Sequence, residues 1–178
     1  MQIIMLSGKA QSGKDTVGLM LTQYLTDYYR ITFADELKRV ARESFGWNGV
    51  KDEAGRQLLQ DVGNAGRKYD ENRWIYPVYN KLYYAQLYDF NYGIITDARY
   101  VNEVEYMKRK FNVTTVRIER FGYDNGLTKE QRADQGETEL DLYDFDYVIH
   151  NNGTVEDMRN EVKYIAKVVM GNRTKNIR

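Results

Sequence analysis

Residues 8–16 read GKAQSGKDT and lie between an apolar run, Ile3 to Leu6, and the start of a helical pattern. The glycines and the lysine are spaced as G-x-x-x-x-G-K, which is the spacing of a phosphate-binding loop. Glycines allow the backbone to curl so that N–H groups point at phosphate oxygens, and the helix N-terminus adds partial positive charge. We expect the ammonium of Lys14 to reach the β- and γ-phosphates of a nucleotide. The predicted phosphate-loop residues are Gly8, Lys9, Ala10, Gln11, Ser12, Gly13, Lys14, Asp15 and Thr16.

One position departs from the usual form of this loop. Asp15 stands where Ser or Thr normally contacts Mg²⁺, and Thr16 comes next. The Asp15 carboxylate can approach a metal directly or through water, or it can serve only as a favourable acid in the first turn of a helix. Asp97 is a third candidate, because it ends an apolar run that is predicted to lie beside the loop. The sequence leaves the Mg²⁺ ligand open between these three residues.

The composition is that of an ordinary globular protein. The chain has 178 residues, enough for one domain with a sizeable core, and its 26 basic and 26 acidic residues give a formal net charge of +0. This balance gives no electrostatic basis for stable nucleic-acid binding. The absence of cysteine excludes disulfides and thiol catalysis, and no apolar run approaches the ~20 residues that cross a bilayer. We therefore expect a soluble, cytoplasmic protein that does not bind membranes.

Short apolar runs alternate with helical patterns along the chain. The predicted strands are residues 2–7, 31–33, 92–96, 113–118 and 146–150. The predicted helices are residues 14–28, 35–45, 51–66, 72–89 and 100–110, with a last helix after residue 154. This alternation is typical of an α/β protein with a parallel sheet and right-handed crossovers. We expect a single domain, residues 1–178.

In a parallel sheet, ligands bind where the strands end, so the segments after the predicted strands share one crevice. Asp35 and Lys38 follow the second strand, and they either hold a substrate group or serve as a helix-start acid and a solvated lysine. Asp97 ends the third strand, where an acid often contacts Mg²⁺ or its water. Arg99 follows, and its guanidinium fork suits a phosphate. We favour binding roles for Asp97 and Arg99.

The polar segment 121–136 has the composition of a mobile lid. It carries several glycines, and Arg117, Arg120 and Arg132 lie just before it or within it. Arginines on a closing lid neutralise the charge that develops during phosphoryl transfer and help to exclude water. Each of these arginines can instead be an ordinary solvated charge. Arg132 is the lid residue that we favour, and with Lys14 and Arg99 it completes the predicted catalytic set.

Six segments in the same order resemble the bacteriophage deoxynucleoside monophosphate kinases, within the wider nucleoside monophosphate kinase superfamily. They are GKAQSGKDT at 8–16, FADELK at 33–38, GRQLLQDVGNAGR at 55–67, NRW at 72–74, DARYVNEV at 97–104 and YVIHNNGT at 147–154. The match spans nearly the whole chain, and the order of these segments is far more specific than the phosphate loop alone. Two departures are Glu36, where the pattern has proline, and Asn64, which leaves the fine contacts of its turn open.

This resemblance implies a P-loop kinase fold, a three-layer α/β/α core with a five-stranded parallel sheet. It also implies a helical substrate-binding insertion at about 46–90 and a lid at about 121–136, with ATP and Mg²⁺ as cofactors. The reaction implied is transfer of the ATP γ-phosphate to a deoxynucleoside monophosphate. Members of that family are often dimers, and the sixteen tyrosines are compatible with a homodimer without showing one. The residues implied on the acceptor side are Phe33, Asp35, Lys38, Gln60, Arg67, Trp74, Asp97 and Arg99.

Two other interpretations remain open at this point. The same fold can phosphorylate another small acceptor, such as dephospho-coenzyme A or phosphomevalonate. A hydroxyl acceptor needs a carboxylate base, for which Asp35 or Asp97 is the candidate, whereas a phosphate acceptor needs several arginines. Arg67, Arg99 and Arg132 favour the phosphate acceptor. The third interpretation is a nucleotide-dependent switch without a small-molecule acceptor.

Overall fold

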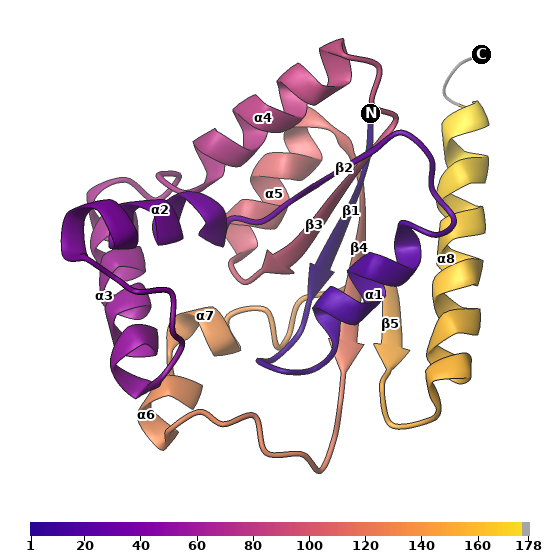
Figure 1. The fold of residues 1–178 in the computed structure, drawn as a ribbon. Coiled ribbons are helices and arrows are strands. Elements are labelled where there is room, and N and C mark those ends of the chain that lie inside the picture. Colours follow the sequence, from indigo (N-terminus) through magenta and orange to yellow (C-terminus); the bar gives the residue numbers. More distant parts are fainter. Residues whose placement is uncertain (176–178) are drawn as a thin grey trace.

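The computed structural model describes residues 1–175 and contains one sheet of five parallel strands in the order β2-β3-β1-β4-β5 (Figure 1). The strands are β1 (Gln2–Ser7), β2 (Tyr28–Ile31), β3 (Tyr92–Ala98), β4 (Asn112–Glu119) and β5 (Tyr147–His150). The helices are α1 (Lys14–Leu21), α2 (Ala34–Phe45), α3 (Glu53–Tyr69), α4 (Ile75–Leu87), α5 (Val101–Lys110), α6 (Lys129–Arg132), α7 (Gln135–Thr138) and α8 (Val155–Lys175). The predicted five-stranded parallel sheet is confirmed.

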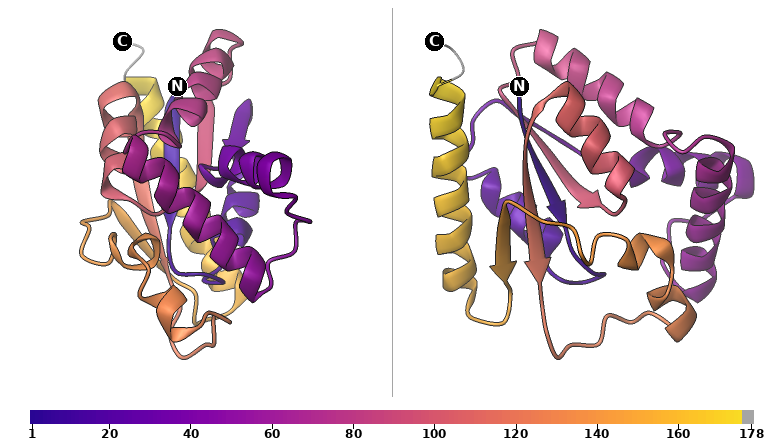
Figure 2. Two further views of the ribbon diagram at one scale, coloured as in Figure 1. Left: turned by 90° about the vertical axis from the view of Figure 1, so that its left-hand side faces the viewer. Right: turned by 180° about the vertical axis from the view of Figure 1, so that it is seen from behind.

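Helices cover both faces of the sheet, which gives three layers (Figure 2). On one face α1 and α8 pack over Ile4 and Leu6 of β1, with Val162 of α8 fully buried. On the other face α4 and α5 pack over Ile3 and Met5 of the same strand. All six residues of β1 are buried, because the strand lies at the centre of the sheet and helices cover it on both sides. The predicted α/β/α architecture is therefore confirmed.

A smaller helical unit projects from the carboxyl ends of β2 and β3. Helices α2 and α3 enclose a third apolar cluster, formed by Leu37, Val62 and Trp74. Helices α6 and α7 follow β4 and lie across from α3 (Figure 1). An Asn64–Asp134 hydrogen bond of 3.5 Å joins the two sides. Residues of α3, of α7 and of the loop after β1 line one cleft.

The structure corrects two predicted boundaries and refines the predicted lid. The first helix ends at Leu21 and not at residue 28, and the second strand is residues 28–31, where 31–33 was expected. The segment 121–136, expected to be a loop, contains α6 and the beginning of α7. No helix within residues 1–175 is long and apolar enough to cross a membrane.

Candidate functional site

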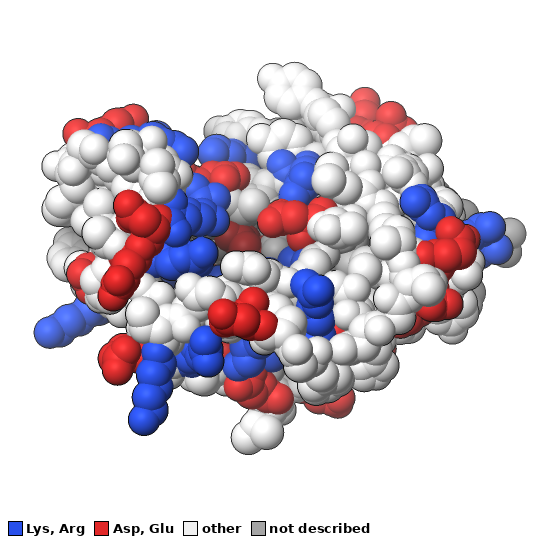
Figure 3. All heavy atoms as spheres, turned by 60° about the horizontal axis from the view of Figure 1, so that its bottom comes forward, with Lys and Arg blue, Asp and Glu red and all other residues white. Residues whose placement is uncertain are grey.

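A cleft of about 470 Å³ lies at the carboxyl ends of β1 and β3. Figure 3 shows it as a hollow, with Lys and Arg side chains gathered along one wall. Its lining comes from the phosphate loop, from α2 and α3, from the end of β3 and from α7. Among the predicted site residues, the lining includes Ala10, Gln11, Lys14, Asp15, Phe33, Lys38, Gln60, Arg67, Trp74, Asp97 and Arg99. The predicted crevice at the strand ends therefore exists in the fold.

The phosphate loop has the geometry that its glycines predict. Gly8 and Gly13 have φ angles of +151° and +105°, which L side chains rarely adopt. A Cβ at Gly13 would lie 2.6 Å from Nδ2 of Asn151, and that same nitrogen donates a 2.8 Å hydrogen bond to the carbonyl of Ser12. The buried hydroxyl of Ser12 has no hydrogen-bond partner within residues 1–175. A curled backbone and an unsatisfied hydroxyl fit a nucleotide phosphate.

Lys14 stands at the centre of this loop. Its ammonium donates hydrogen bonds of 2.7 Å to the carbonyl oxygens of Gly8 and Lys9. Burial, and after it the nearby charge of Arg99, lower the pKa of Lys14 from 10.5 to about 8. The carbonyls hold the ammonium inside the loop. Contact between Lys14 and nucleotide phosphates stays a prediction.

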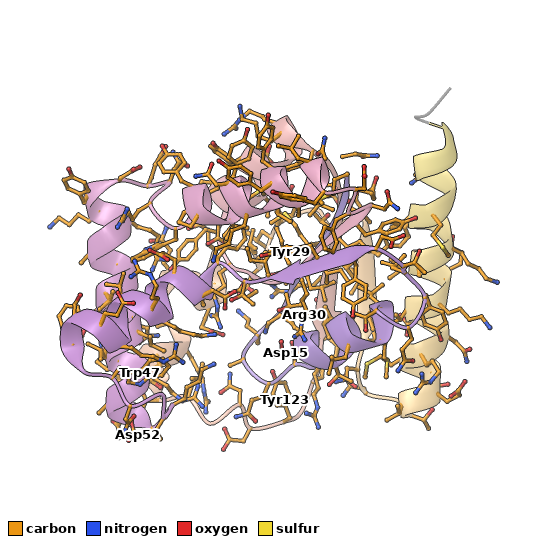
Figure 4. All side chains as sticks on the ribbon, turned by 45° about the horizontal axis from the view of Figure 1, so that its top comes forward. Asp15, Tyr29, Arg30, Trp47, Asp52 and Tyr123 are labelled. Atoms are coloured by element: carbon orange, nitrogen blue, oxygen red, sulfur yellow. The ribbon has the colours of Figure 1, made fainter. Side chains whose placement is uncertain are left out.

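The three predicted Mg²⁺ ligands lie in different settings. Asp15 borders the cleft with 81% of its side chain exposed, and its carboxylate accepts a 2.7 Å hydrogen bond from Arg30 of β2 (Figure 4). The hydroxyl of Thr96 approaches the same oxygen at 3.4 Å. Thr16 is exposed and is not part of the cleft lining. Within the described chain no three His, Asp or Glu side chains group as a metal centre. Of the three predicted ligands, Asp15 is the one with an exposed carboxylate at the cleft, and its role toward Mg²⁺ stays a prediction.

Asp97 and Asp35 both hold the start of α2. The two carboxylate oxygens of Asp97 accept hydrogen bonds of 2.8 and 2.9 Å from the N–H groups of Phe33 and Ala34. Burial raises the pKa of Asp97, and these two bonds oppose the rise. The carboxylate of Asp35 accepts bonds of 2.6 and 3.1 Å from the hydroxyl and N–H of Thr32, and Asp35 lies outside the cleft lining. Both acids therefore stabilise a helix start.

Arg99 meets an acid that the sequence analysis did not identify. Its guanidinium forms an ion pair with the carboxylate of Glu137 in α7 and donates a 3.1 Å hydrogen bond to the carbonyl of Gly136. The other carboxylate oxygen of Glu137 accepts a 3.2 Å bond from the N–H of Ala10, and Lys9 donates to the Glu137 carbonyl. Only 6% of the Glu137 side chain is exposed. The Glu137 carboxylate of α7 thus bridges the phosphate loop and the cleft arginine.

A second buried acid fixes the backbone that carries Arg99. The carboxylate of Glu103 accepts hydrogen bonds of 2.8 and 3.1 Å from the N–H groups of Arg99 and Tyr100. Burial raises the pKa of Glu103 from 4.5 to about 8. The two bonds orient the turn between β3 and α5, so that Arg99 and Tyr100 both face the cleft. In the sequence, Glu103 stands out only as one residue of the DARYVNEV segment at 97–104.

The far wall of the cleft is aromatic and basic. The guanidinium of Arg67 lies 4.1 Å from the centre of the Tyr100 ring and donates a 2.8 Å hydrogen bond to Asn64. Trp74 is buried, and its indole N–H donates a 3.0 Å bond to the carbonyl of Gly63. Arg67 and Trp74, which are predicted only through the family resemblance, therefore lie in one wall, and Lys38 and Gln60 complete it.

The favoured lid arginine does not reach the cleft in this structure. Arg132 donates hydrogen bonds of 3.2 Å to Asn125 and Asp124 of its own loop. Arg120 lies closer to the phosphate loop and contacts the carbonyl of Gln11 at 3.4 Å. The catalytic role of Arg132 stays a prediction that would need the lid to move. Cleft residues that the sequence analysis did not select include Lys51, Arg56, Leu59, Tyr100, Glu103, Leu127, Asp134 and Glu137.

Comparison with known proteins identifies the fold. The sequence matches no protein-family profile and no curated protein. Dephospho-CoA kinase from Campylobacter jejuni is similar in structure, with a TM-score of 0.61 and 12% identity over 97% of this chain and 100% of that chain. Shikimate kinase from Bacteroides thetaiotaomicron has a TM-score of 0.52 and 16% identity over 94% and 98%. Shikimate kinase from Aquifex aeolicus has a TM-score of 0.50 and 20% identity over 97% and 98%. The chain therefore has the fold of the P-loop kinases.

Proposed function

We propose that the protein is a deoxynucleoside monophosphate kinase, which transfers the γ-phosphate of ATP to a deoxynucleoside monophosphate and releases ADP and the diphosphate. The observation that carries this proposal is the arrangement of the cleft, in which a phosphate loop faces a basic wall that contains Trp74 and Tyr100. Such a cleft suits an acceptor that has both an aromatic base and an anionic group. The P-loop kinase fold and the resemblance to the phage enzymes agree with this interpretation.

Two side chains of the cleft are proposed to act on the transferred phosphate. Lys14 exchanges its two carbonyl acceptors for phosphate oxygens and stabilises the charge that develops on them. Arg99 lies two residues after Asp97 in the same cleft. It neutralises negative charge between the phosphate of the donor and that of the acceptor. Mg²⁺ held through Asp15 would supply further positive charge on the β- and γ-phosphates, with Thr16 and Asp97 as the alternative ligands.

The engagement of the two carboxylates predicted as candidate bases favours a phosphate acceptor over a hydroxyl acceptor. A hydroxyl must lose a proton to a base, whereas a phosphate oxygen is already an anion and needs none. The two candidate bases, Asp35 and Asp97, each accept two hydrogen bonds at the start of α2. These bonds occupy both oxygens of each carboxylate and hold them at the start of the helix, away from a substrate hydroxyl. The nucleobase of the acceptor nucleotide is proposed to lie against Phe33 and Trp74.

The test is turnover by the purified protein with ATP, Mg²⁺ and a panel of acceptors. The panel contains the ribo- and deoxynucleoside monophosphates, together with dephospho-coenzyme A and shikimate as hydroxyl acceptors. We expect a diphosphate product from at least one deoxynucleoside monophosphate. Transfer to a hydroxyl acceptor alone would contradict the proposal, and ATP binding without transfer to any acceptor would favour the nucleotide-dependent switch.

A further inference from the structure

Three basic side chains on one wall of the cleft have no partner of their own. Lys38 in α2, Lys51 in the loop before α3 and Arg56 in α3 all line the cleft. Within residues 1–175, none of the three side chains is within ion-pair or hydrogen-bond distance of an acceptor. The acids of the cleft lining form ion pairs or accept hydrogen bonds from other groups. They are Asp15, Asp97, Glu103, Asp134 and Glu137. The α2–α3 wall therefore carries uncompensated positive charge.

These three basic groups line one cleft and act on one another's charge. The pKa of Lys51 is lowered, first by burial and then by the charges of Lys38, Arg56 and Arg99, while Asp15 opposes this shift more weakly. Like charges that outnumber the acids near them raise the free energy of the empty site. An anion bound among them would remove this repulsion. The positive charge of the α2–α3 wall thus indicates that its ligand is negatively charged.

The loop that carries Lys51 is held in place by its own contacts. The indole N–H of Trp47 donates a 2.9 Å hydrogen bond to the carbonyl of Val50, and Asp52 caps α3 by accepting a 2.8 Å bond from Gly55 (Figure 4). Trp47 is 8% exposed, and Arg42 lies over its ring at 5.2 Å. Lys51 lies between these two fixed points. Its position at the cleft follows from the fold rather than from free movement of the loop.

We propose that Lys38, Lys51 and Arg56 form an anion subsite that binds the acceptor's own phosphate group, a phosphate monoester dianion. This inference rests on the proposed function and makes it more specific. The subsite shares the cleft with the phosphate loop, so the acceptor phosphate lies between two groups of positive charge, next to the phosphate that it receives. The organic part of the acceptor then packs on Leu37, Leu59 and Trp74 of the same wall.

Binding of inorganic phosphate tests the subsite without any turnover. The phosphate loop is first saturated with a non-hydrolysable ATP analogue and Mg²⁺, and phosphate is then titrated at constant ionic strength and followed by phosphorus NMR. We expect Lys51→Met and Arg56→Met each to weaken phosphate binding about 10- to 100-fold, because each removes a charge-assisted hydrogen bond. Lys68→Met, an exposed lysine of α3 outside the cleft, is the matched control and should bind phosphate like the wild type.

The same variants separate this inference from the proposed function. With a deoxynucleoside monophosphate as acceptor, KM should rise in Lys51→Met and Arg56→Met while the Kd for ATP stays unchanged, and Arg56→Lys should restore part of the loss. Equal phosphate binding by the variants and the wild type, or no phosphate binding by the wild type, would overturn the subsite. Loss of phosphate binding in the variants, in a protein that phosphorylates no nucleoside monophosphate, would support the subsite and refute the nucleotide acceptor.

Discussion

If ATP binds as proposed, Lys14 couples this binding to pH, because burial lowers the pKa of its ammonium to about 8 in the free protein. Below that pH the ammonium is already charged and ready to meet phosphate oxygens. Above pH 8 the free protein must take up a proton when the nucleotide binds, since the phosphates raise the pKa of Lys14 back toward its usual value. We expect the Kd for ATP to rise by up to about tenfold per pH unit above pH 8.

Calorimetric titration of ATP and Mg²⁺ between pH 7 and 10 measures this effect. Lys14→Met provides the comparison, because methionine keeps the length of the side chain without a titrating group. Its affinity should be much weaker and nearly independent of pH over the same range. A slope as steep as that of the wild type would assign the titration to another group.

Glu137 uses donors that a phosphate group needs. Its carboxylate accepts from Ala10 of the phosphate loop and pairs with Arg99, so an incoming phosphate competes with a buried charge of the same sign. Glu137→Gln removes that charge and keeps the shape of the side chain. We expect the Kd for ATP to fall by about 3- to 10-fold, as measured by calorimetry, because one charge-assisted contact no longer has to be broken. Glu130→Gln, an exposed acid of α6, should leave the Kd unchanged, and a weaker affinity in Glu137→Gln would instead show that Glu137 supports binding.

Local sequence signals account for part of this site and miss the rest. Lys14, Asp97 and Arg99 could be placed in one crevice because each lies at or beyond the carboxyl end of a strand of the same parallel sheet. Glu137 has no such signal, since its contact with Ala10 joins residues 127 positions apart through the fold of the lid. The role of Asp97 at the start of α2 was equally out of reach, because it depends on how β3 ends beside Phe33.

At the scale of the helix, α3 and the Trp74 indole fit together through a glycine. A Cβ at Gly66 would lie between 2.5 and 2.9 Å from three atoms of the indole ring. We expect Gly66→Ala to lower the free energy of unfolding by about 1–3 kcal/mol in urea denaturation, despite the better helix propensity of alanine. Gly171→Ala in α8, where none of the described residues lies within 4 Å of the added Cβ, should instead raise it by up to about 1 kcal/mol. Equal effects of the two changes would mean that the Trp74 contact is not tight.

Element boundaries were predicted less well than element types, and the end of α1 shows why. Tyr24 and Leu25 continue the apolar spacing of the first helix, yet the helix stops at Leu21 and the chain turns at Asp27, which has a φ of +53°. Leu25 is only 2% exposed all the same. The apolar spacing therefore predicted the burial of Leu25 correctly. The turn into β2 depends on the pairing of β2 with β3, which a local sequence pattern does not predict.

At the scale of the whole molecule, ATP binding should be visible as thermal stabilisation. A ligand at 100 times its Kd stabilises the folded state by about 2.7 kcal/mol, and each kcal/mol raises Tm by about 2–4 °C in a domain of this size. We therefore expect ATP with Mg²⁺ to raise Tm by about 5–10 °C in differential scanning fluorimetry. Lys14→Met should show little of this shift, and an equal shift in that variant would place the nucleotide elsewhere.

The clamp between Asn151 and the phosphate loop has a consequence for protein synthesis. Asn151 and the α8 side chains that pack on α1, such as Val162, lie more than a hundred residues after the loop and are therefore synthesised after it. A nascent chain that stops before them carries the whole loop sequence without the partner that holds Ser12 in place. The phosphate loop can therefore take its final shape only after β5 and the turn that follows it have been made.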